Sequence, residues 1–401
     1  MFSSNPPLGL YIHLPWCEKK CPYCDFNSHQ ADSIPEQAYI EALLEDLEQD
    51  LPLVWGRGID SIFIGGGTPS LFSAAAIEQL FSGLRSLLNF APAIEITMES
   101  NPGSADAENY QGYREAGVNR LSIGVQSFND QHLKTLGRVH NGEQARRAFA
   151  IARTAGFDNI NLDLMFGLPA QNLAAATADL VQAIALGPEH ISLYQLTLEP
   201  NTLFHHQPPA NMPDDDLCWE QQNACQALLA RHGYDQYEVS AYCLNKRECR
   251  HNLNYWHFGD YLGIGAGAHG KITLGSENRV LRRVRQRQPR AYLERTGCDR
   301  ISSETILDED DLLFEFMLNA LRLKHGFDIS LFRDNTGLSL NLLLPGLEQA
   351  RDKGLVEFDG VKIVPTELGF CHLNDLQGLF LQLHNAKRRP FFESSGEITH
   401  N

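Results

Sequence analysis

The sequence predicts an α/β fold, in which an incomplete parallel (β/α)6 barrel precedes a small C-terminal α+β domain. Three observations support this prediction. Apolar, β-branched segments alternate six times with segments of helical periodicity, a pattern typical of right-handed βαβ units and a parallel sheet. Two helical segments and a hairpin signal follow after residue 306. The 401 residues are enough for both parts, and a doubly wound sheet is the alternative to the barrel.

The predicted elements alternate along the first 236 residues. The strands are Leu10–Leu14, Ser61–Ile64, Ile94–Met98, Leu121–Val125, Asn159–Met165 and His190–Leu196. The helices are Glu36–Leu51, Ala74–Leu88, Ala105–Ala116, Gly142–Ala155, Ala174–Leu186 and Asp214–Arg231. Ser104 precedes the third helix and Asp214 opens the sixth, while Gly117, Gly156 and Gly233 follow helix ends.

The remaining sequence departs from this alternation. Tyr237–Arg290 is rich in Gly, Asn, Tyr and His, and we expect it to close the barrel. A helix then begins near Asp308, and Leu338–Lys353 is a second helix before a hairpin at Asp359-Gly360, so the end resembles a winged-helix module. The predicted divisions are 1–236 for the barrel, 237–305 for the closing segment, 306–375 for the C-terminal domain and 376–401 for a tail.

Charge and composition restrict the function. A net charge of −17 argues against nucleic acid as a partner, because that binding depends on Lys and Arg. The N-terminus has no basic segment and no cleavage site of a signal peptide, and no run of apolar residues would span a membrane. Nine cysteines in such a chain are more typical of ligands and buried thiols than of disulfides. We therefore expect a cytoplasmic protein.

Three closely spaced cysteines form the main candidate metal site. Cys17, Cys21 and Cys24 lie within WCEKKCPYCDF, and Pro22 favours a loop over a helix there. Thiolates are the usual ligands of iron–sulfur clusters, and three ligands on a four-iron cluster would leave one iron open. A zinc site and three inert thiols are the alternatives. No fourth Cys or His has a matching spacing, although His13 and His29 are near.

Polar or glycine-rich residues follow several predicted strands at the same end. Gly65–Thr68 follow the second strand, Glu99 the third and Gln126 the fourth, while Asp163 lies in the fifth and Arg138 follows Gln126 by twelve residues. Parallel barrels carry their chemistry at this end of the strands. Each residue alone has a structural explanation, such as a turn or a cap. Their shared position predicts one site.

Together the cysteine spacing, GGGTP, ESNP, GVQSF and DLMFGLP resemble the radical S-adenosylmethionine superfamily. The resemblance extends over most of residues 8–375 and is strongest to the oxygen-independent coproporphyrinogen III oxidase branch. It implies a [4Fe–4S] cluster on Cys17, Cys21 and Cys24, whose open iron binds S-adenosylmethionine. It also implies cofactor-binding residues: Tyr11 beside the cofactor, Gly66, Gly67 and Thr68 at its methionine end, and Glu99, Gln126, Arg138 and Asp163 around it.

Two features separate the chain from the dehydrogenases of that branch. Phe26 stands where their pattern has a fourth cysteine, and only 16 residues precede Cys17. The segment HNLNYW instead matches the HNxxYW signature of heme chaperones related to these enzymes. The resemblance implies heme contact by His251, Asn252, Tyr255 and Trp256. From the residues alone, a structural loop histidine that donates to the backbone is the alternative for His251. We predict a heme chaperone that delivers heme to heme-requiring proteins, in particular membrane respiratory proteins, with coproporphyrinogen III dehydrogenase as the alternative.

The arginines downstream of this motif leave several interpretations open. Arg279, Arg282, Arg283, Arg285, Arg287 and Arg290 lie within twelve residues. They could hold heme propionates, meet anionic lipid or form a face paired with acidic neighbours. The expected partners are therefore heme and heme-acceptor proteins. A homodimer, peripheral membrane contact and an enzymatic activity beyond the cofactor site all remain open.

Overall fold

The computed structural model describes residues 2 and 4–381. Within this part of the chain, the largest sheet has twelve strands in the order β14-β13-β12-β11-β1-β4-β5-β6-β7-β8-β10-β9. Six neighbouring strands are parallel and follow chain order: β1 (Leu8–Leu14), β4 (Gly58–Gly66), β5 (Asn89–Ser100), β6 (Arg120–Gln126), β7 (Ile160–Phe166) and β8 (His190–Gln195). The six predicted strands are confirmed. The doubly wound alternative is wrong, because such a sheet reverses its strand order.

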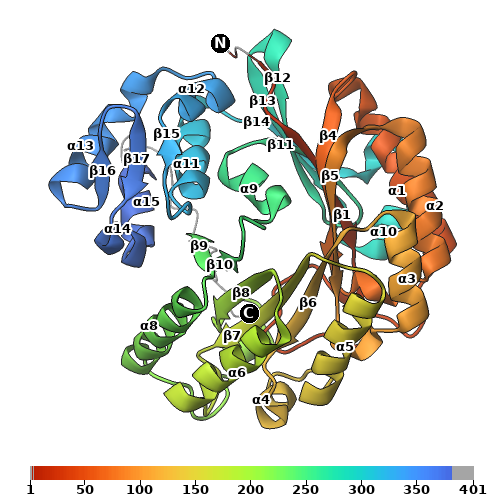
Figure 1. Ribbon diagram of the computed structural model, residues 1–401. Coiled ribbons are helices and arrows are strands. Elements are labelled where there is room, and N and C mark those ends of the chain that lie inside the picture. The colour runs from red at the N-terminus through yellow and green to blue at the C-terminus, as the bar shows by residue number, and fades with distance from the viewer. Residues whose placement is uncertain (1, 3, 382–401) are drawn as a thin grey trace, which may run out of the picture.

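Six long helices cover the outer face of these strands (Figure 1). They are α1 (Glu36–Asp50), α2 (Ala74–Leu87), α3 (Ala107–Ala116), α5 (Gly142–Thr154), α6 (Leu173–Leu186) and α8 (Asp215–Arg231). Asp214 caps α8 and Gly117 ends α3, as predicted. Ser104 does not cap α3, because it lies in a separate 3-10 turn and Asp106 accepts the hydrogen bonds from the first turn. No helix among the described residues has the length and apolar composition to cross a membrane.

The segment that we expected to close the barrel adds strands to both edges of the sheet. β9 (Asp235–Glu238) and β10 (Ala241–Cys243) extend the edge at β8. β11 (Asp260–Ile264) pairs in parallel with β1, and three antiparallel strands follow: β12 (His269–Leu274), β13 (Arg279–Arg285) and β14 (Ile301–Ile306). Between the two sets, α9 (Arg250–Trp256) lies on the concave side of the sheet (Figure 1) and contacts β4 and β1.

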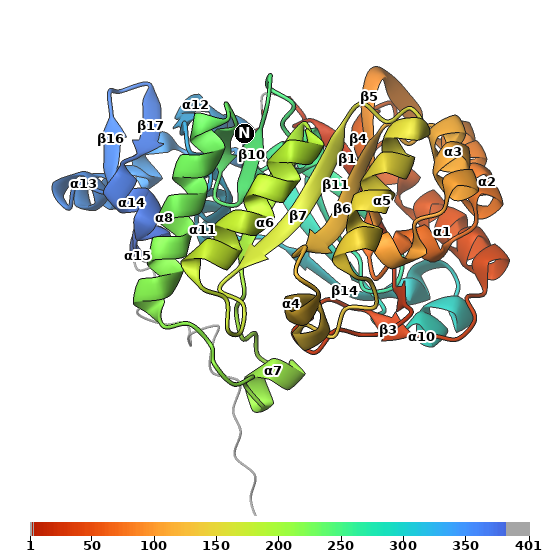
Figure 2. The ribbon, with the colours of Figure 1, turned by 60° about the horizontal axis from the view of Figure 1, so that its bottom comes forward.

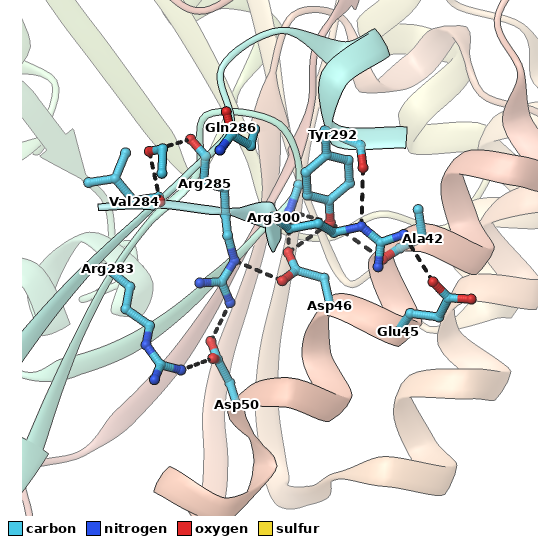
Figure 3. A network of polar contacts seen from close by, with 12 residues as sticks. Ala42, Glu45, Asp46, Asp50, Arg283, Val284, Arg285, Gln286, Tyr292 and Arg300 are labelled. Carbon is cyan, nitrogen blue, oxygen red and sulfur yellow. Dashed lines mark hydrogen bonds and ion pairs between the residues drawn. The ribbon is translucent and has the colours of Figure 1, made fainter. Parts of the chain in front are cut away.

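Most of the arginine cluster is paired with carboxylates. Arg285 is only 1% exposed and contacts both Asp46 and Asp50 of α1 (Figure 3). Arg283 also contacts Asp50, so these pairs fasten β13 to α1. The other ion pairs are Arg279 with Glu277, Arg282 with Glu315 and Arg290 with Glu294. Of these six arginines, only Arg287 forms no ion pair with a described residue, so the acid-paired face is the interpretation that the structure supports.

The C-terminal part has a hydrophobic core of its own, which includes Phe316, Phe332 and Ile363. Its elements are α11 (Glu309–Ala320), β15 (Phe327–Asp328), α12 (Ser330–Thr336), α13 (Leu344–Asp352), β16 (Val356–Phe358), β17 (Lys362–Pro365), α14 (Glu367–Cys371) and α15 (Leu373–Leu381). Asp359 lies in the turn of the predicted hairpin and accepts hydrogen bonds from two backbone amides. Residues 376–381 form the end of α15 and not a tail, because Leu376 and Phe380 enter this core. Residues 382–401 lie outside the described part.

Candidate cofactor site

The interior of the barrel is polar because side chains alternate along each strand. In β6, Arg120, Ser122, Gly124 and Gln126 face a cavity of about 390 Å³, while the residues between them enter the core beneath the helices. The cavity brings together all three predicted cysteine ligands and seven of the eight predicted S-adenosylmethionine residues. The latter are Gly66, Gly67, Thr68, Glu99, Gln126, Arg138 and Asp163. Residues far apart in the sequence therefore border one space.

A short parallel pairing holds the cysteine loop at the carboxyl ends of the strands. β2 (Trp16–Cys17) pairs with β3 (His29–Gln30), so the loop between them is closed at its base. β3 lies with α4 (Asp130–Thr135) and α7 (Leu203–His206) at one end of the molecule (Figure 2). Phe204 of α7 donates its backbone N–H to Pro22 O at 3.0 Å. Neighbouring segments thus support the loop from outside.

Each thiol has a polar neighbour. Thr68 Oγ1 lies 3.5 Å from Cys17 Sγ, Arg138 Nη1 lies 3.7 Å from Cys21 Sγ, and Ser28 Oγ lies 3.6 Å from Cys24 Sγ. Burial raises the pKa of the Cys17 and Cys24 thiols, and their hydroxyl neighbours oppose that rise. Hydrogen-bond donors to sulfur are a common feature of iron–sulfur sites, where they tune the cluster.

The number of thiols argues against structural zinc, which needs a fourth ligand. The three thiols instead border a cavity large enough for a bulkier group. Their number and position suit a [4Fe–4S] cluster with one open iron.

Glycine is needed at positions 66 and 67 because the segment before Cys17 lies directly against them. Gly67 N donates to Leu14 O at 2.8 Å, and Thr68 N donates to Trp16 O at 2.7 Å. A Cβ at Gly67 would lie 2.4 Å from Trp16 O, which no side chain could tolerate. Gly66 adopts φ +117, and a Cβ there would meet the ring of His13. Glycine therefore permits the segment before Cys17 to lie against the end of β4.

Two half-buried carboxyl groups face the cavity. Glu99 accepts a hydrogen bond from Gly66 N at 3.1 Å, and burial together with repulsion from Asp163 raises its pKa to about 7. Asp163 accepts hydrogen bonds from Ser122 and Asn161, and burial raises its pKa as well. A ligand with cationic groups or hydroxyl donors would stabilise both carboxylates. S-adenosylmethionine has these groups, so the residues fit it.

Gln126 and Arg138 come from a part of the sequence where the prediction missed a helix. Gln126 adopts φ +66 at the end of β6, a conformation that is rare outside glycine. α4 follows, and Arg138 returns from it to donate to Gly124 O at 2.9 Å. The helix cap Asn129 was the available signal for α4.

Tyr11, the eighth predicted residue, is one side chain away from the cavity. Its hydroxyl lies 2.9 Å from Nδ1 of His13. Its ring stacks on that of Phe63, which does line the cavity. Tyr11 can therefore support the wall of the site. Tyr11 itself does not line the cavity.

The HNLNYW residues of α9 occupy three different environments. His251 is 1% exposed, and its two ring nitrogens lie 2.9 Å from Ser61 Oγ and 2.9 Å from Tyr255 Oη. In this arrangement neither nitrogen is free for iron, and burial lowers its pKa to about 3. Asn252 lines the cofactor cavity. Tyr255 and Trp256 line a second pocket, described next.

This second pocket has a volume of about 200 Å³ and lies beside α9, β11 and α11. Its lining is aromatic and basic: Tyr255, Trp256, Phe258, Gly259, Tyr261, Lys271, Arg282 and Asn319. Trp256 Nε1 is buried without a hydrogen-bond partner among the described residues. Arg322 of the C-terminal part stacks 4.2 Å from the Trp256 ring. α9 thus connects the cofactor cavity with the C-terminal part.

Sequence reasoning missed several polar residues that line the cofactor cavity, among them Arg120, Ser122, Asn161 and Ser192. They lie within strands and not after them, so a search of strand ends passes over them. The available signal was the alternation of polar and apolar residues in RLSIGVQ and INLDLMF. In a barrel such alternation indicates an interior that receives a polar ligand.

Comparison with known proteins extends these observations. Residues 11–181 match the family model of the radical SAM superfamily, and residues 307–372 match that of the HemN C-terminal domain. The chain is 47% identical to the heme chaperone HemW of Escherichia coli (strain K12) over 377 residues, which cover 94% of this chain and 98% of that protein. It is 34% identical to the heme chaperone HemW of Bacillus subtilis (strain 168) over 379 residues, with 92% and 98% covered.

A solved structure shows the same fold. Coproporphyrinogen III oxidase (HemN) from Escherichia coli, a radical SAM enzyme, superposes with a TM-score of 0.79. The match covers 94% of this chain and 91% of that protein at 24% sequence identity. At this identity the likeness shows a common architecture.

Proposed function

The chain belongs to the HemW family of the radical SAM superfamily, and on this premise we propose that it is a heme chaperone. It binds heme and passes it to a heme-requiring protein, and it carries a [4Fe–4S] cluster and S-adenosylmethionine. The observation that carries this proposal is the place of α9. Its HNLNYW residues contact the cofactor cavity on one side and an aromatic, basic pocket on the other.

In this proposal Cys17, Cys21 and Cys24 hold the cluster. The seven cavity-lining residues named above bind S-adenosylmethionine, and Tyr11 supports the wall behind them. When bound, the cluster and S-adenosylmethionine supply one-electron chemistry. The chain's own contribution is to orient the cofactor. Arg138 lies beside the thiol of Cys21. Glu99 and Asp163 provide hydrogen-bond acceptors in the wall of the cavity.

Heme contact involves Tyr255 and Trp256, whose rings line the second pocket with Lys271 and Arg282. Aromatic rings suit a porphyrin face and cations suit propionates. A pocket of about 200 Å³ is small for a whole heme, so binding requires α9 to move relative to the C-terminal part. Iron binding by His251 would also require its contacts with Ser61 of β4 and with Tyr255 of α9 to break.

The acceptor and the compartment are also part of the proposal. All nine cysteines are free, which supports action in a reducing compartment such as the cytoplasm. We propose a respiratory membrane protein as the acceptor, because these proteins require heme. Arg287 has no carboxylate partner among the described residues and offers one cation for peripheral membrane contact. A homodimer would bring two such cations to one surface.

Heme titration of the anaerobically reconstituted protein tests the proposal. The wild type should bind heme stoichiometrically and should leave coproporphyrinogen III unchanged under reducing conditions. Trp256→Ala should weaken heme binding, while Trp219→Ala, which changes a half-exposed indole on α8, should not. Turnover of coproporphyrinogen III would favour the dehydrogenase instead. Exposed Phe26, at the position of that enzyme pattern's fourth cysteine, argues against it.

A further inference from the structure

A chain of buried hydrogen bonds leads from the wall of the cofactor cavity to the start of α9. At the cavity end, Asn161 Nδ2 donates to Asp163 Oδ1 at 2.8 Å and to Ser122 Oγ at 2.7 Å. Ser122 Oγ in turn donates to Asp163 Oδ2 at 2.9 Å. Both carboxylate oxygens of Asp163 are therefore held by side chains of the barrel interior.

The chain continues behind Asn161, away from the cavity. His190 Nδ1 lies 2.6 Å from Asn161 Oδ1, and His190 Nε2 lies 2.8 Å from Tyr237 Oη. The backbone N–H of Cys249, the residue before α9, donates to Tyr237 Oη at 3.2 Å. His190 and Tyr237 are buried, and neither borders the cavity. Their effect on a ligand in the cavity is therefore indirect.

The two ends of this chain fix the direction of its protons. A backbone N–H can only donate, and an ionised carboxylate can only accept. Cys249 N–H therefore donates to Tyr237 Oη, whose own proton lies toward Nε2 of His190. Burial lowers the pKa of His190 well below its usual value, so the ring is neutral and carries its one proton on Nδ1. That proton faces Asn161 Oδ1, and the amide protons of Asn161 face Asp163.

His190 is the neighbour that fixes the orientation of the Asn161 amide. Ser192 Oγ also lies 3.0 Å from Asn161 Oδ1, and Ser122 Oγ lies near Asn161 Nδ2. A hydroxyl group can rotate to donate or to accept, so these serines would tolerate either orientation of the amide. The Nδ1 proton of His190 accepts only the oxygen. Without it, the amide could turn that oxygen toward the carboxylate of Asp163.

Asp163 needs this support because its surroundings oppose ionisation. Burial raises its pKa, while the hydrogen bonds to its oxygens and the positive charge of Arg120 oppose that rise. Glu99 and Tyr194 also face it across the cavity, and Glu99 repels it when both carboxyl groups are ionised. A carboxylate that accepts several hydrogen bonds is stabilised in its charged form. The chain thus favours a charged Asp163 with a fixed orientation.

We infer that His190 is a positioning residue, which orients the carboxylate of Asp163 toward a ligand in the cavity by holding the amide of Asn161. The inference rests on the proposed function for the identity of this ligand, S-adenosylmethionine, whose hydroxyl and cationic groups suit a carboxylate. His190 does this without touching the ligand. Its contribution is one proton, held on Nδ1 and donated to Asn161 Oδ1.

Calorimetric titration of S-adenosylmethionine into the anaerobically reconstituted protein tests this role. His190→Leu removes the donor and keeps much of the side-chain volume. It should weaken binding by about tenfold, the effect of one hydrogen bond. His190→Asn should bind more tightly than His190→Leu, because its Nδ2 can take the place of Nδ1 and donate to Asn161.

Two neighbouring tyrosines provide a matched pair of variants that does not depend on the folding of His190→Leu. Tyr237→Phe removes one hydroxyl from the chain and should weaken binding by about threefold, because Nε2 of His190 loses its donor. Tyr234→Phe removes a buried hydroxyl outside the chain, which donates to Pro188 O at 2.6 Å. Both variants should unfold at a lower temperature, and only Tyr237→Phe should lose affinity.

A double-mutant cycle separates positioning of Asp163 from a general disturbance of the site. If His190 acts through Asp163, its substitution has little left to change once that carboxylate is absent. His190→Leu should therefore alter the affinity of the Asp163→Asn protein by no more than about twofold. A disturbance of the whole cavity would weaken binding equally in both backgrounds.

Three results would overturn the inference. One is wild-type affinity in folded His190→Leu, and another is equal affinity in Tyr237→Phe and Tyr234→Phe. The third is the same loss from His190→Leu in the wild-type and Asp163→Asn backgrounds. Failure of the wild type to bind S-adenosylmethionine would contradict the proposed function itself, and the inference would fall with it.

Discussion

Ser61 Oγ lies 2.9 Å from Nδ1 of His251, a contact that joins β4 to α9 across 190 residues of sequence. Tyr255 Oη occupies the other ring nitrogen from within α9. The histidine of the HNLNYW motif is therefore a structural connection between the barrel and this helix in the observed arrangement. Heme binding through His251 would require that connection to break.

His251→Ala should reduce the free energy of unfolding by about 2–4 kcal/mol, because it leaves a cavity and two unpaired hydroxyl groups. Denaturant unfolding measures this change. Asn252→Ala is the control on the same helix. Its free energy of unfolding should decrease less, because Asn252 lines a cavity and is partly exposed. An equal loss in both variants would show that the Ser61–His251 contact contributes little.

The same histidine predicts a pH dependence of stability. Burial lowers the pKa of His251 to about 3, so between pH 3 and its unfolded value of about 6.5 the unfolded state binds more protons. This contribution to stability is complete above about pH 6.5 and falls as the pH decreases toward 3. Denaturant unfolding of the wild type and of His251→Gln should be compared at pH 7 and pH 5. The free energy of unfolding should decrease less between these pH values in the variant than in the wild type.

The raised pKa of Glu99 predicts that a cationic cofactor binds more tightly as the pH rises. Its pKa is raised to about 7, so the carboxylate is mostly protonated at pH 6 and mostly ionised at pH 8. Calorimetric titration of S-adenosylmethionine should show tighter binding at pH 8. Glu99→Gln should bind about tenfold more weakly at pH 8, the loss of one charged hydrogen bond, and should lack most of the pH effect. An unchanged pH profile in this variant would exclude Glu99 as the cause.

Gly67→Ala should disturb the cysteine loop, because the new Cβ would lie 2.4 Å from Trp16 O. Overpacking of this kind costs about 1–3 kcal/mol. Iron and acid-labile sulfide measured after reconstitution should both fall below the wild-type values. Gly378→Ala is the control, because nothing lies within 4 Å of a Cβ there. Full cluster content in Gly67→Ala would show that the loop tolerates displacement.

Substitution of any one of the three cluster cysteines should cause a selective loss of iron. Cys17→Ala, Cys21→Ala and Cys24→Ala should each lose most of the iron and sulfide after reconstitution, because a three-thiolate site loses an essential ligand. Cys298→Ala, at an exposed cysteine in another part of the chain, should retain both. Zinc in place of iron in the purified wild type would contradict the cluster assignment.

The barrel and the cavity residues at strand ends were predictable because local sequence determines them. The apolar runs specify parallel strands. Glu99 and Gln126 lie at the ends of two of them and Asp163 lies within a third, so topology alone brings them together. The environment of His251 was not predictable, because it depends on the docking of α9 against Ser61. The arginine cluster was ambiguous for the same reason, since Asp46 and Asp50 come from a distant helix.

The most direct test of the heme-chaperone account is heme titration of the reconstituted wild type and of Trp256→Ala, with coproporphyrinogen III turnover measured in parallel. The account predicts stoichiometric heme binding, weaker binding in the variant and no turnover. Absence of heme binding by the wild type, or conversion of coproporphyrinogen III, would contradict it.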